Sequence, residues 1–534
     1  MIIFFSFVFL SIFLVSPYAF GKPVVSLNDM NFHLSRAYES YFQINNGNIF
    51  HLIPDINTKT FGSFGLPINS FYPLYMMLPF VFIHLLIHSA YASYLIFLVI
   101  IYIAIFSSMY IASYKITKSK IAGIFSAVIY GCCPWITYDM FEGRDFGENL
   151  AFIVIPICLY GLYQIMVGNY KKWYILSFAM ALLVLTHIVT FTLFLFFILI
   201  SCGFLIINKN NEGLLRLKYL LIAGITAFGL SIFDIITLFQ NYKSLGSISI
   251  HIFQLSQYTN NFSDMLTNRF GIIEPIILIL SFIYWKKLNS FTKYLVLVTL
   301  AFVFISSNQF PWDVFQNYLK FLQCPWRFST LINLLVAFIA GQLIKNFKIK
   351  TKYLLLIGTI LVSVSSVLTL NMQFKHNPTA NNSIYINKEN FEKIESSSNV
   401  IDYIPENDGS NVTDLLFAHS IPKSNSKKQI TQRNWKTSYN RIEYTINNKN
   451  KDTNINLPNI YYPGYHALVN NKEVPISVDK HHLISIPIKH GINKITLIYK
   501  KTLLTLIGIL ISLLTFISLI TYIIKKNHFS NTNN

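Results

Sequence analysis

The chain has 534 residues, of which 53% are hydrophobic and only 12% are charged, and its formal net charge is +19. Soluble domains carry roughly a quarter charged residues, so this composition excludes an ordinary soluble protein and predicts a membrane protein with several helical spans. The positive charge does not predict nucleic-acid binding, because most Lys and Arg outside the segment 372–500 form short clusters between apolar runs, where they set orientation.

The N-terminal run, residues 1–20, is apolar enough to form the first helix. It ends in small residues, as a cleaved signal peptide would, but it lacks the basic region that normally precedes the apolar part of a signal. Because many further spans follow, we expect an uncleaved first helix.

A polar stretch follows this helix. SLNDMNFHLSRAYES, residues 26–40, places Asp29, His33 and Arg36 within eight positions of one another. It begins a long first external loop, predicted to cover residues 21–90.

The end of this loop, residues 71–89, contains two prolines and two histidines, which suit a lipid-buried helix poorly. We therefore predict a helix that lies on the outer surface or re-enters it. His84 and His88 are four positions apart and could bind a metal, but no partner carboxylate is evident in the sequence.

The basic clusters orient the remaining apolar runs, since Lys and Arg accumulate on the cytoplasmic side. Placing every cluster inside predicts about twelve spans with both termini cytoplasmic. Parity requires the short run 174–187 to be one of them. The predicted spans lie near residues 1–20, 91–113, 121–137, 151–168, 174–187, 190–207, 219–238, 271–285, 292–307, 327–344, 353–371 and 502–524.

Residues 372–500 differ from the rest because they carry alternating strand patterns separated by Asn, Gly and Lys-rich turns. They predict an extracytoplasmic, mainly β domain that resembles a sandwich. The domains are then a transmembrane domain, 1–371, the β domain, 372–500, and a last helix with a cytoplasmic tail, 501–534. Patterned strands and hairpin turns are expected at RIEYTI (441–446), LISIPI (483–488), KITLIY (494–499), Asn470-Asn471 and 491–493.

Polar residues gather on the predicted outer side. The second external loop, YDMFEGRDFGEN (138–149), contains Arg144, Asp145 and Glu148, and the outer helix ends carry His187 and Arg327. Charged residues near membrane spans tend to be functional.

Each of these residues also has a plain structural interpretation. Asp29 and Arg36 could be solvated residues of a loop helix, and His33 could pack or form a hydrogen bond. Arg144 and Glu148 could form an i, i+4 ion pair. Two further alternatives concern the helix ends: a buried structural histidine at His187 and an interfacial anchor at Arg327.

The joint pattern is more informative than its members. An enzyme that takes a sugar from a lipid phosphate needs a carboxylate to deprotonate the acceptor hydroxyl. It also needs cationic groups to hold the phosphate that leaves. The predicted topology puts candidates for both on one side of the membrane.

Several motifs resemble, in order, those of large bacterial membrane proteins named for a 6-pyruvoyl-tetrahydropterin synthase-related membrane domain. The first is DMNFHLSR, which is similar to their Asp-x-x-Phe-His-Leu-x-Arg signature. IYYPGYHALVNNKEV (460–474) and DYIP (402–405) resemble the external β domain of these and of teichoic-acid-glycosylating membrane proteins. The other similar stretches are GLPINSFYPL (65–74), EGRDFGENLAFIVIPICLYGL (142–162), THIVTF (186–191) and LQCPWRF (322–328). The chain departs from the pattern at Asp145, Tyr465 and Asn470-Asn471.

The layout of this family is similar to the GT-C fold of glycosyltransferases that use polyprenyl-phosphate sugars. The resemblance implies a catalytic base at Asp29 and a second acidic site residue at Glu148 or Asp145. It implies phosphate contacts at Arg144 and Arg327, and supporting or substrate-binding roles for His33, Arg36 and His187. Some GT-C enzymes use a divalent metal, so the resemblance allows one, although no ligand set is visible in the sequence.

The function expected from these observations is that of a glycosyltransferase in a bacterial cytoplasmic membrane. Its partners would be a lipid-linked sugar donor, membrane lipid and a cell-envelope acceptor, namely a cell-wall polymer, a glycolipid or a protein. Two alternatives are a transporter or flippase of lipid-linked substrates and a non-catalytic cell-envelope scaffold. A transporter would place more charges inside the spans, where Asp234 is the main example.

Overall fold

The computed structural model describes residues 1–19, 24–25, 28–49, 52–207, 212–245, 253–261, 271–346, 385–386, 434–449 and 451–532. The chain divides into two compact units, which are described separately. Unit 1 comprises residues 1–29, 94–230 and 252–387, and unit 2 comprises residues 30–93, 231–251 and 388–534.

Helices long and apolar enough to cross a membrane confirm that the chain is a membrane protein. Six described helices meet this criterion by length and composition, and the bent pair Lys120–Gly131 and Pro134–Gly143 would be a seventh. These six are Ala90–Thr117, Phe146–Met166, Ile188–Ile206, Gly213–Leu245, Pro325–Lys345 and Leu503–Lys526.

The prediction of about twelve spans is not confirmed. Most of the other predicted spans coincide with described helices that are shorter than the roughly 20 residues a span needs. These are α1 (Ile2–Ala19), α9 (Tyr174–Val184), α13 (Ile273–Ile283) and α14 (Ser290–Ser306). The predicted span 353–371 and the DYIP motif lie outside the described residues. The segment predicted to be a surface or re-entrant helix forms α4 (Leu78–Ile87), which has ten residues.

Close helix packing in unit 1 depends on small residues. Helix α8 (Phe146–Met166) meets α9 at Gly161, where an added Cβ would lie 2.6 Å from the backbone nitrogen of Leu176. Helix α16 (Ser329–Asn346) meets α6 (Lys120–Gly131) at Gly341, where an added Cβ would collide with Ser126. Glycine therefore allows these helix backbones to approach closely.

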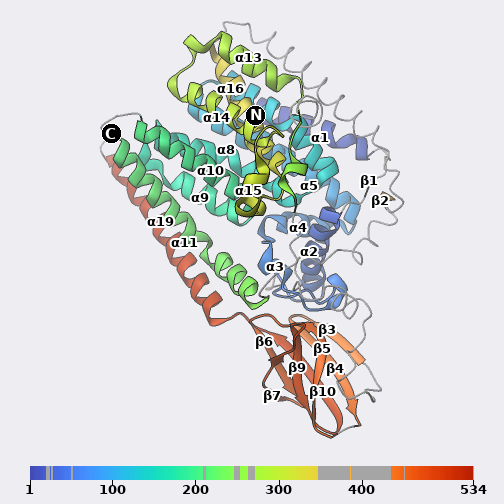
Figure 1. Ribbon diagram of the computed structural model, residues 1–534. Coiled ribbons are helices and arrows are strands. Elements are labelled where there is room, and N and C mark those ends of the chain that lie inside the picture. The colour runs from blue at the N-terminus through green and yellow to red at the C-terminus, as the bar shows by residue number, and fades with distance from the viewer. Residues whose placement is uncertain are drawn as a thin grey trace. The chain divides into compact units, whose positions relative to one another are not determined.

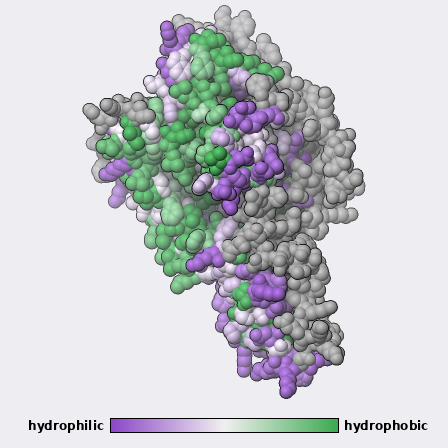
Figure 2. Space-filling model, viewed as in Figure 1, coloured by the Kyte–Doolittle hydropathy of each residue, from purple (hydrophilic) through white to green (hydrophobic). Residues whose placement is uncertain are grey.

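The surface of the helical part is largely apolar. On the face shown in Figure 2, hydrophobic side chains cover much of the helical region, whereas the β domain presents mainly hydrophilic ones. Exposed apolar side chains on α10 (Ile188–Ile207) include Leu195, Phe196 and Leu199. Apolar surface on this scale is expected where lipid replaces water as the solvent.

Unit 2 contains the β-rich region that the sequence predicts. Within residues 434–449 and 451–532 the strands form a five-stranded sheet in the order β3-β4-β10-β6-β7 and a three-stranded sheet in the order β5-β9-β8 (Figure 1). Buried side chains from both sheets share one core, so the sheets pack face to face. The strands are β3 (Asn434–Ser438), β4 (Arg441–Asn448), β5 (Thr453–Ile460), β6 (Tyr465–Val469), β7 (Lys472–Val474), β8 (Ser477–Val478), β9 (Leu483–Ile488) and β10 (Gly491–Tyr499).

The local patterns located the predicted strands and one of the two turns. Strands β4, β9 and β10 contain the three stretches expected, and Asn470 and Asn471 connect β6 to β7 with φ values of +50° and +65°. The predicted hairpin turn at 491–493 is wrong. These residues begin β10, and β9 and β10 belong to different sheets, so their connection is no hairpin.

Part of the first loop completes the core of the β domain. Ile56, Phe64 and Leu66 are buried in the same cluster as the strand residues. The Tyr465 hydroxyl donates to the Gly65 carbonyl, and Asn459 Nδ2 donates to the Phe64 carbonyl over 2.8 Å. The β domain therefore needs a segment that lies hundreds of residues earlier in the sequence.

Glu39 of helix α2 (Asn28–Asn45) fixes the conformation of this loop segment. Its buried carboxylate accepts hydrogen bonds from the backbone N–H groups of residues 58, 59 and 60 at 2.9–3.0 Å. The hydroxyls of Thr58 and Thr60 and the amide of Gln43 donate to it as well. Each carboxylate oxygen thus accepts three hydrogen bonds, which compensates for its removal from water.

We expect Glu39→Gln to destabilise unit 2. The new amide would place N–H groups against backbone N–H donors, and each buried donor left without an acceptor costs about 1–3 kcal/mol. Thermal unfolding of the purified protein should begin at a lower temperature, and protease should cut within residues 54–72 sooner. Glu473→Gln, at a side chain 69% exposed, is the matched control and should change neither. Equal behaviour of the two variants would contradict this role of Glu39.

Candidate functional site

The candidate site lies in unit 1 where the second polar loop leads into helix α8. Helix α7 (Pro134–Tyr138) is followed by a π-helical turn, Asp139–Gly143, and then by Arg144 in the left-handed conformation, with φ 54°. π-helical turns are rare and frequently occur at functional sites. The Arg144 N–H donates to the Asp139 carbonyl at 2.5 Å, which closes the turn.

Asp145 begins α8 as its N-cap. Its Oδ1 accepts from the backbone N–H groups of Gly147 and Glu148, at 2.9 and 3.3 Å. A carboxylate is favoured here because the first N–H groups of a helix have no partner within the helix and carry partial positive charge. The capping interaction uses only Oδ1, so the second carboxylate oxygen, Oδ2, takes no part in it.

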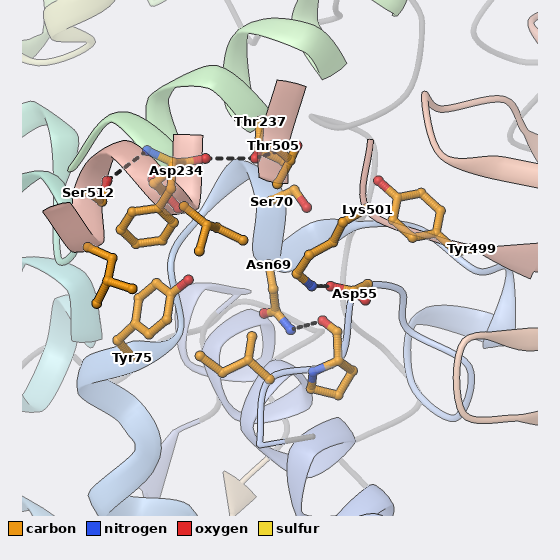
Figure 3. A pocket seen from close by; sticks show the side chains of 15 residues that line it. Asp55, Asn69, Ser70, Tyr75, Asp234, Thr237, Tyr499, Lys501, Thr505 and Ser512 are labelled. Carbon is orange, nitrogen blue, oxygen red and sulfur yellow. Dashed lines mark hydrogen bonds and ion pairs between the residues drawn. The ribbon is translucent and has the colours of Figure 1, made fainter. Parts of the chain in front are cut away.

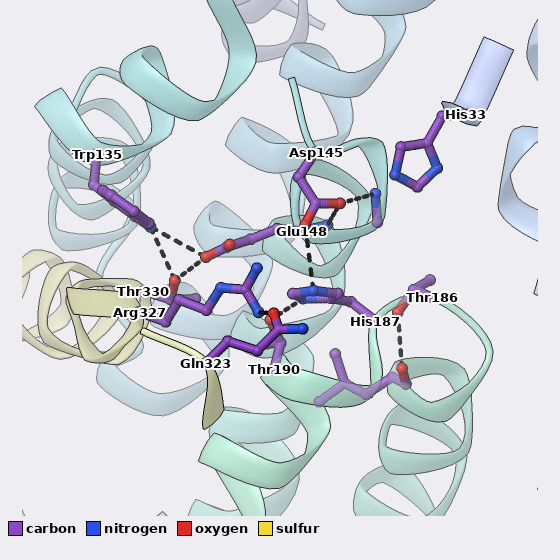
Figure 4. A network of polar contacts seen from close by, with 12 residues as sticks. His33, Trp135, Asp145, Glu148, Thr186, His187, Thr190, Gln323, Arg327 and Thr330 are labelled. Carbon is purple, nitrogen blue, oxygen red and sulfur yellow. Dashed lines mark hydrogen bonds and ion pairs between the residues drawn. The ribbon is translucent and has the colours of Figure 1, made fainter. Parts of the chain in front are cut away.

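Glu148 stands three positions after this cap, where a capping-box glutamate would bond back to the N-cap N–H. It is used differently here (Figure 4). Its Oε1 accepts from Trp135 Nε1 at 3.2 Å and from the Thr330 hydroxyl, and the side chain is only 3% exposed. Trp135 and Thr330 also contact each other at 2.9 Å, so α7, α8 and α16 together orient this carboxylate. No hydrogen bond joins Oε2 to any described residue.

His187 approaches the same carboxylates from the connection between α9 and α10. Its Nε2 lies 3.4 Å from Asp145 Oδ2, and its Nδ1 lies 2.7 Å from Thr190 Oγ1 (Figure 4). The threonine therefore fixes the ring and directs Nε2 at Asp145. Histidines that bind metals are normally oriented by a hydrogen bond at the second ring nitrogen in this way.

Together Asp145, Glu148 and His187 form a set that could hold a metal ion. One ligand atom from each lies within 4.8 Å of those of the other two. Two carboxylates and one imidazole suit a divalent cation such as Mn²⁺ or Zn²⁺. The set fits such an ion because Asp145 Oδ2 and His187 Nε2 face each other and Glu148 retains an oxygen without a hydrogen bond.

Two arginines provide positive charge near these acids. Arg327 lies in the 3₁₀ turn Pro325–Phe328 just before α16, and its Nη1 donates to Gln323 Oε1 at 2.8 Å. Its charge acts on Glu148 and Asp139. Arg144 is buried, and its Nε donates to the Phe141 carbonyl at 2.8 Å, so part of its guanidinium supports the loop itself.

Asp139 is a site residue that the sequence did not single out. It is buried, its Oδ2 has no hydrogen-bond partner, and the charges of Glu148, Asp145 and Arg327 all act on it. In the sequence, the feature that could have indicated Asp139 is its position in the acidic loop 138–149, together with Asp145 and Glu148. The π-helical turn that directs it inward is not visible in any local pattern.

The remaining predicted residues divide between the units. Asp29 is exposed in the first turn of α2, and its charge also acts on Asp139. His33 and Arg36 belong to unit 2, where both are buried. The Arg36 guanidinium donates to Asn69 Oδ1, His33 Nδ1 and the Tyr72 carbonyl, and it lies 4.9 Å from the centre of the Tyr72 ring. These contacts hold the first loop.

Comparison with known proteins links the chain to bacterial membrane proteins. Residues 411–512 match the model of the family described as bacterial membrane protein YfhO. Over 574 aligned positions the chain is 25% identical to an uncharacterized protein of Lactococcus lactis subsp. cremoris (strain MG1363), and the alignment covers 93% of this chain and 91% of that protein. No solved structure matches.

We expect the purified protein to bind Mn²⁺ or Zn²⁺ at the Asp145, Glu148 and His187 set. Asp145→Asn and His187→Ala should each weaken binding by at least about 100-fold, since loss of a supporting residue alone costs 10–100-fold. Asparagine is also a good N-cap, so Asp145→Asn should leave α8 intact. Isothermal titration calorimetry measures the affinity.

Asp313→Asn serves as the control, because Asp313 is an exposed acid in the first turn of α15 (Trp312–Leu319), outside the set. It should bind the metal as tightly as the unchanged chain. Metal affinity that is the same in all four proteins would exclude this site.

Proposed function

We propose that the chain is a membrane glycosyltransferase with a GT-C-like architecture. It moves a sugar from a polyprenyl-phosphate-linked donor to an acceptor outside the cytoplasmic membrane, such as a cell-wall polymer, a glycolipid or a protein. The observation that carries the proposal is the convergence in unit 1 of Asp145, Glu148 and His187 with the positive charge of Arg327. Such a combination suits the transfer of a group away from phosphate.

The reaction needs a base for the acceptor. As the acceptor oxygen forms its bond to the anomeric carbon, the bond from that carbon to the phosphate oxygen breaks, and the phosphate departs with the electron pair. Asp29 takes the proton of the acceptor hydroxyl. It suits this step because it is an exposed carboxylate whose charge acts on one buried acid of the site, Asp139.

The donor phosphate gains negative charge as it leaves. Arg327 offsets that charge, and its bond to Gln323 holds the guanidinium in place before the reaction. A divalent cation held by Asp145, Glu148 and His187 would supply further positive charge for the phosphate oxygens. Trp135, Thr330 and Thr190 keep these ligands oriented.

The proposed topology places this site and the β domain on the outer side, with both termini in the cytoplasm. Several basic clusters flank the apolar helices on the opposite side in this arrangement, for example Lys171 and Lys172 after α8. The partial match to the bacterial membrane protein YfhO family supports a membrane location.

Asp29→Asn should reduce sugar transfer about 10²–10⁴-fold, because a positioned general base contributes that much. The assay uses membranes containing the protein, radiolabelled polyprenyl-phosphate sugars and extracted cell-envelope acceptor. Asp313→Asn, also at an exposed acid, should transfer at the normal rate. Undiminished transfer by Asp29→Asn would remove this residue from the mechanism.

Arg327→Gln should reduce the rate of transfer about 10²–10³-fold, the cost of losing one positioned group that stabilises developing charge. The same guanidinium carries the charge and makes the bond to Gln323, so Gln323→Ala tests positioning separately. It should cause a smaller loss. A larger defect in Gln323→Ala than in Arg327→Gln would show that the turn, and not the charge, matters.

A further inference from the structure

Unit 2 contains a cavity of about 430 Å³ that plays no part in the proposed transfer site. Three segments of unit 2 line it (Figure 3). These are parts of the first loop between residues 53 and 75, the part of α11 (Gly213–Leu245) around Asp234, and the end of β10 with the first turns of α19 (Leu503–Thr532). A cavity of this size falls in the range of small-molecule and lipid-head-group sites.

One wall of the cavity is apolar and consists largely of helix side chains. Phe233, Ile509 and Leu513 line it, and the Tyr75 ring meets the Phe233 ring edge to face with centroids 5.7 Å apart. Helices α11 and α19 can approach each other closely because Gly508 of α19 has no side chain. An added Cβ there would lie 2.9 Å from Phe233 Cα.

The cavity also contains a carboxylate without a hydrogen bond. Asp234 is only 8% exposed, yet no hydrogen bond joins its side chain to any described residue. A buried carboxylate without donors is costly, so an occupant that donates hydrogen bonds would be strongly favoured. Tyr75 and Ser512 also line the cavity, and the Ser512 oxygen already accepts from the Phe233 N–H at 3.4 Å.

The charges determine which kind of donor fits. The second carboxylate of the cavity, Asp55, pairs with Lys501 and accepts from Asn440 Nδ2 at 2.7 Å. The charge of Arg36 acts on Asp234. The negative charges of Asp55 and Asp234 are thus balanced by the positive charges of Lys501 and Arg36. This balance gives no net attraction for an ammonium group, and two carboxylates oppose a phosphate.

We infer that this cavity binds the uncharged, hydroxyl-rich head group of an amphiphile, with Asp234 accepting hydrogen bonds from its hydroxyls. Such O–H donors form short, strong bonds to a carboxylate. The apolar wall formed by α11 and α19 receives the adjoining lipid part. A neutral glycolipid has both parts, a hydroxyl-rich head group and an apolar tail. A free saccharide has only the hydroxyl-rich part.

The test is native mass spectrometry of the full chain, purified in detergent and titrated with lipid probes that have identical acyl chains. The probes are monoglucosyl-diacylglycerol, phosphatidylethanolamine and phosphatidic acid, and free maltose represents a sugar without a lipid part. We expect the glucosyl lipid to bind most tightly. Asp234→Ala should weaken its binding about tenfold to a hundredfold, the loss expected for hydrogen bonds to a charged group.

Two further variants keep the inference testable if removal of the acid disturbs folding. Ile509→Trp fills the cavity while Asp234 stays in place, and it should also abolish binding of the glucosyl lipid. Asp313→Ala removes an exposed acid of unit 1 and should bind normally.

Three results would overturn the inference. The first is glucosyl-lipid binding that is equal in the unchanged chain, Asp234→Ala and Ile509→Trp. The second is a preference for phosphatidic acid or phosphatidylethanolamine that disappears with Asp234→Ala, which would assign the cavity to a charged head group. The third is maltose binding as tight as glycolipid binding, which would assign it to a soluble sugar. None of these outcomes depends on sugar transfer in unit 1.

Discussion

The structure depends on how an apolar chain accommodates carboxylates away from water. A buried acid is stable only when surrounding groups donate hydrogen bonds or supply positive charge, and these donors must come from rigid elements. Glu39 obtains them from successive backbone N–H groups of one loop, and Glu148 obtains them from side chains on two other helices. Both acids therefore determine the conformation of the segments around them. In unit 2 this is the first loop on which the β domain closes, and in unit 1 it is the start of α8.

Much of this arrangement follows from local sequence. Apolar run length located the long helices, and alternation located β4, β9 and β10. The start of α8 was located only approximately, because the span was predicted near 151–168 and the helix begins at Phe146 with Asp145 as its N-cap. Run length was less informative where helices are short or bent, as in α9, which has 11 residues, and in the pair α6 and α7, which is bent by 43°. The prediction of about twelve spans is therefore not confirmed, since six described helices, or seven with the bent pair, are long and apolar enough to cross a membrane.

Long-range contacts could not be predicted from these patterns. Nothing in the first loop indicates that Ile56, Phe64 and Leu66 would complete a core made by strands near the other end of the chain. The candidate metal-ligand set has the same origin, because His187 reaches Asp145 only after α8 and α9 have packed against each other at Gly161. The sequence did suggest the individual residues, since polar groups beside apolar runs are conspicuous. Helix packing brings these residues together, and their spacing along the chain does not predict which of them will meet.

The hydrogen bonds that each acid already accepts distinguish structural from ligand-binding carboxylates. A carboxylate has about four lone-pair positions. Glu39 accepts six hydrogen bonds from described residues, three on each oxygen, so it has no capacity left and its role is to hold the loop. Glu148 uses one oxygen, and Asp234 accepts no hydrogen bond from any described residue. A buried oxygen that accepts no hydrogen bond is costly. Such an oxygen is therefore expected where a bound molecule or ion supplies the missing donor or positive charge. This difference supports the proposals that Glu148 and Asp234 serve ligands, and it gives Glu39 a structural role.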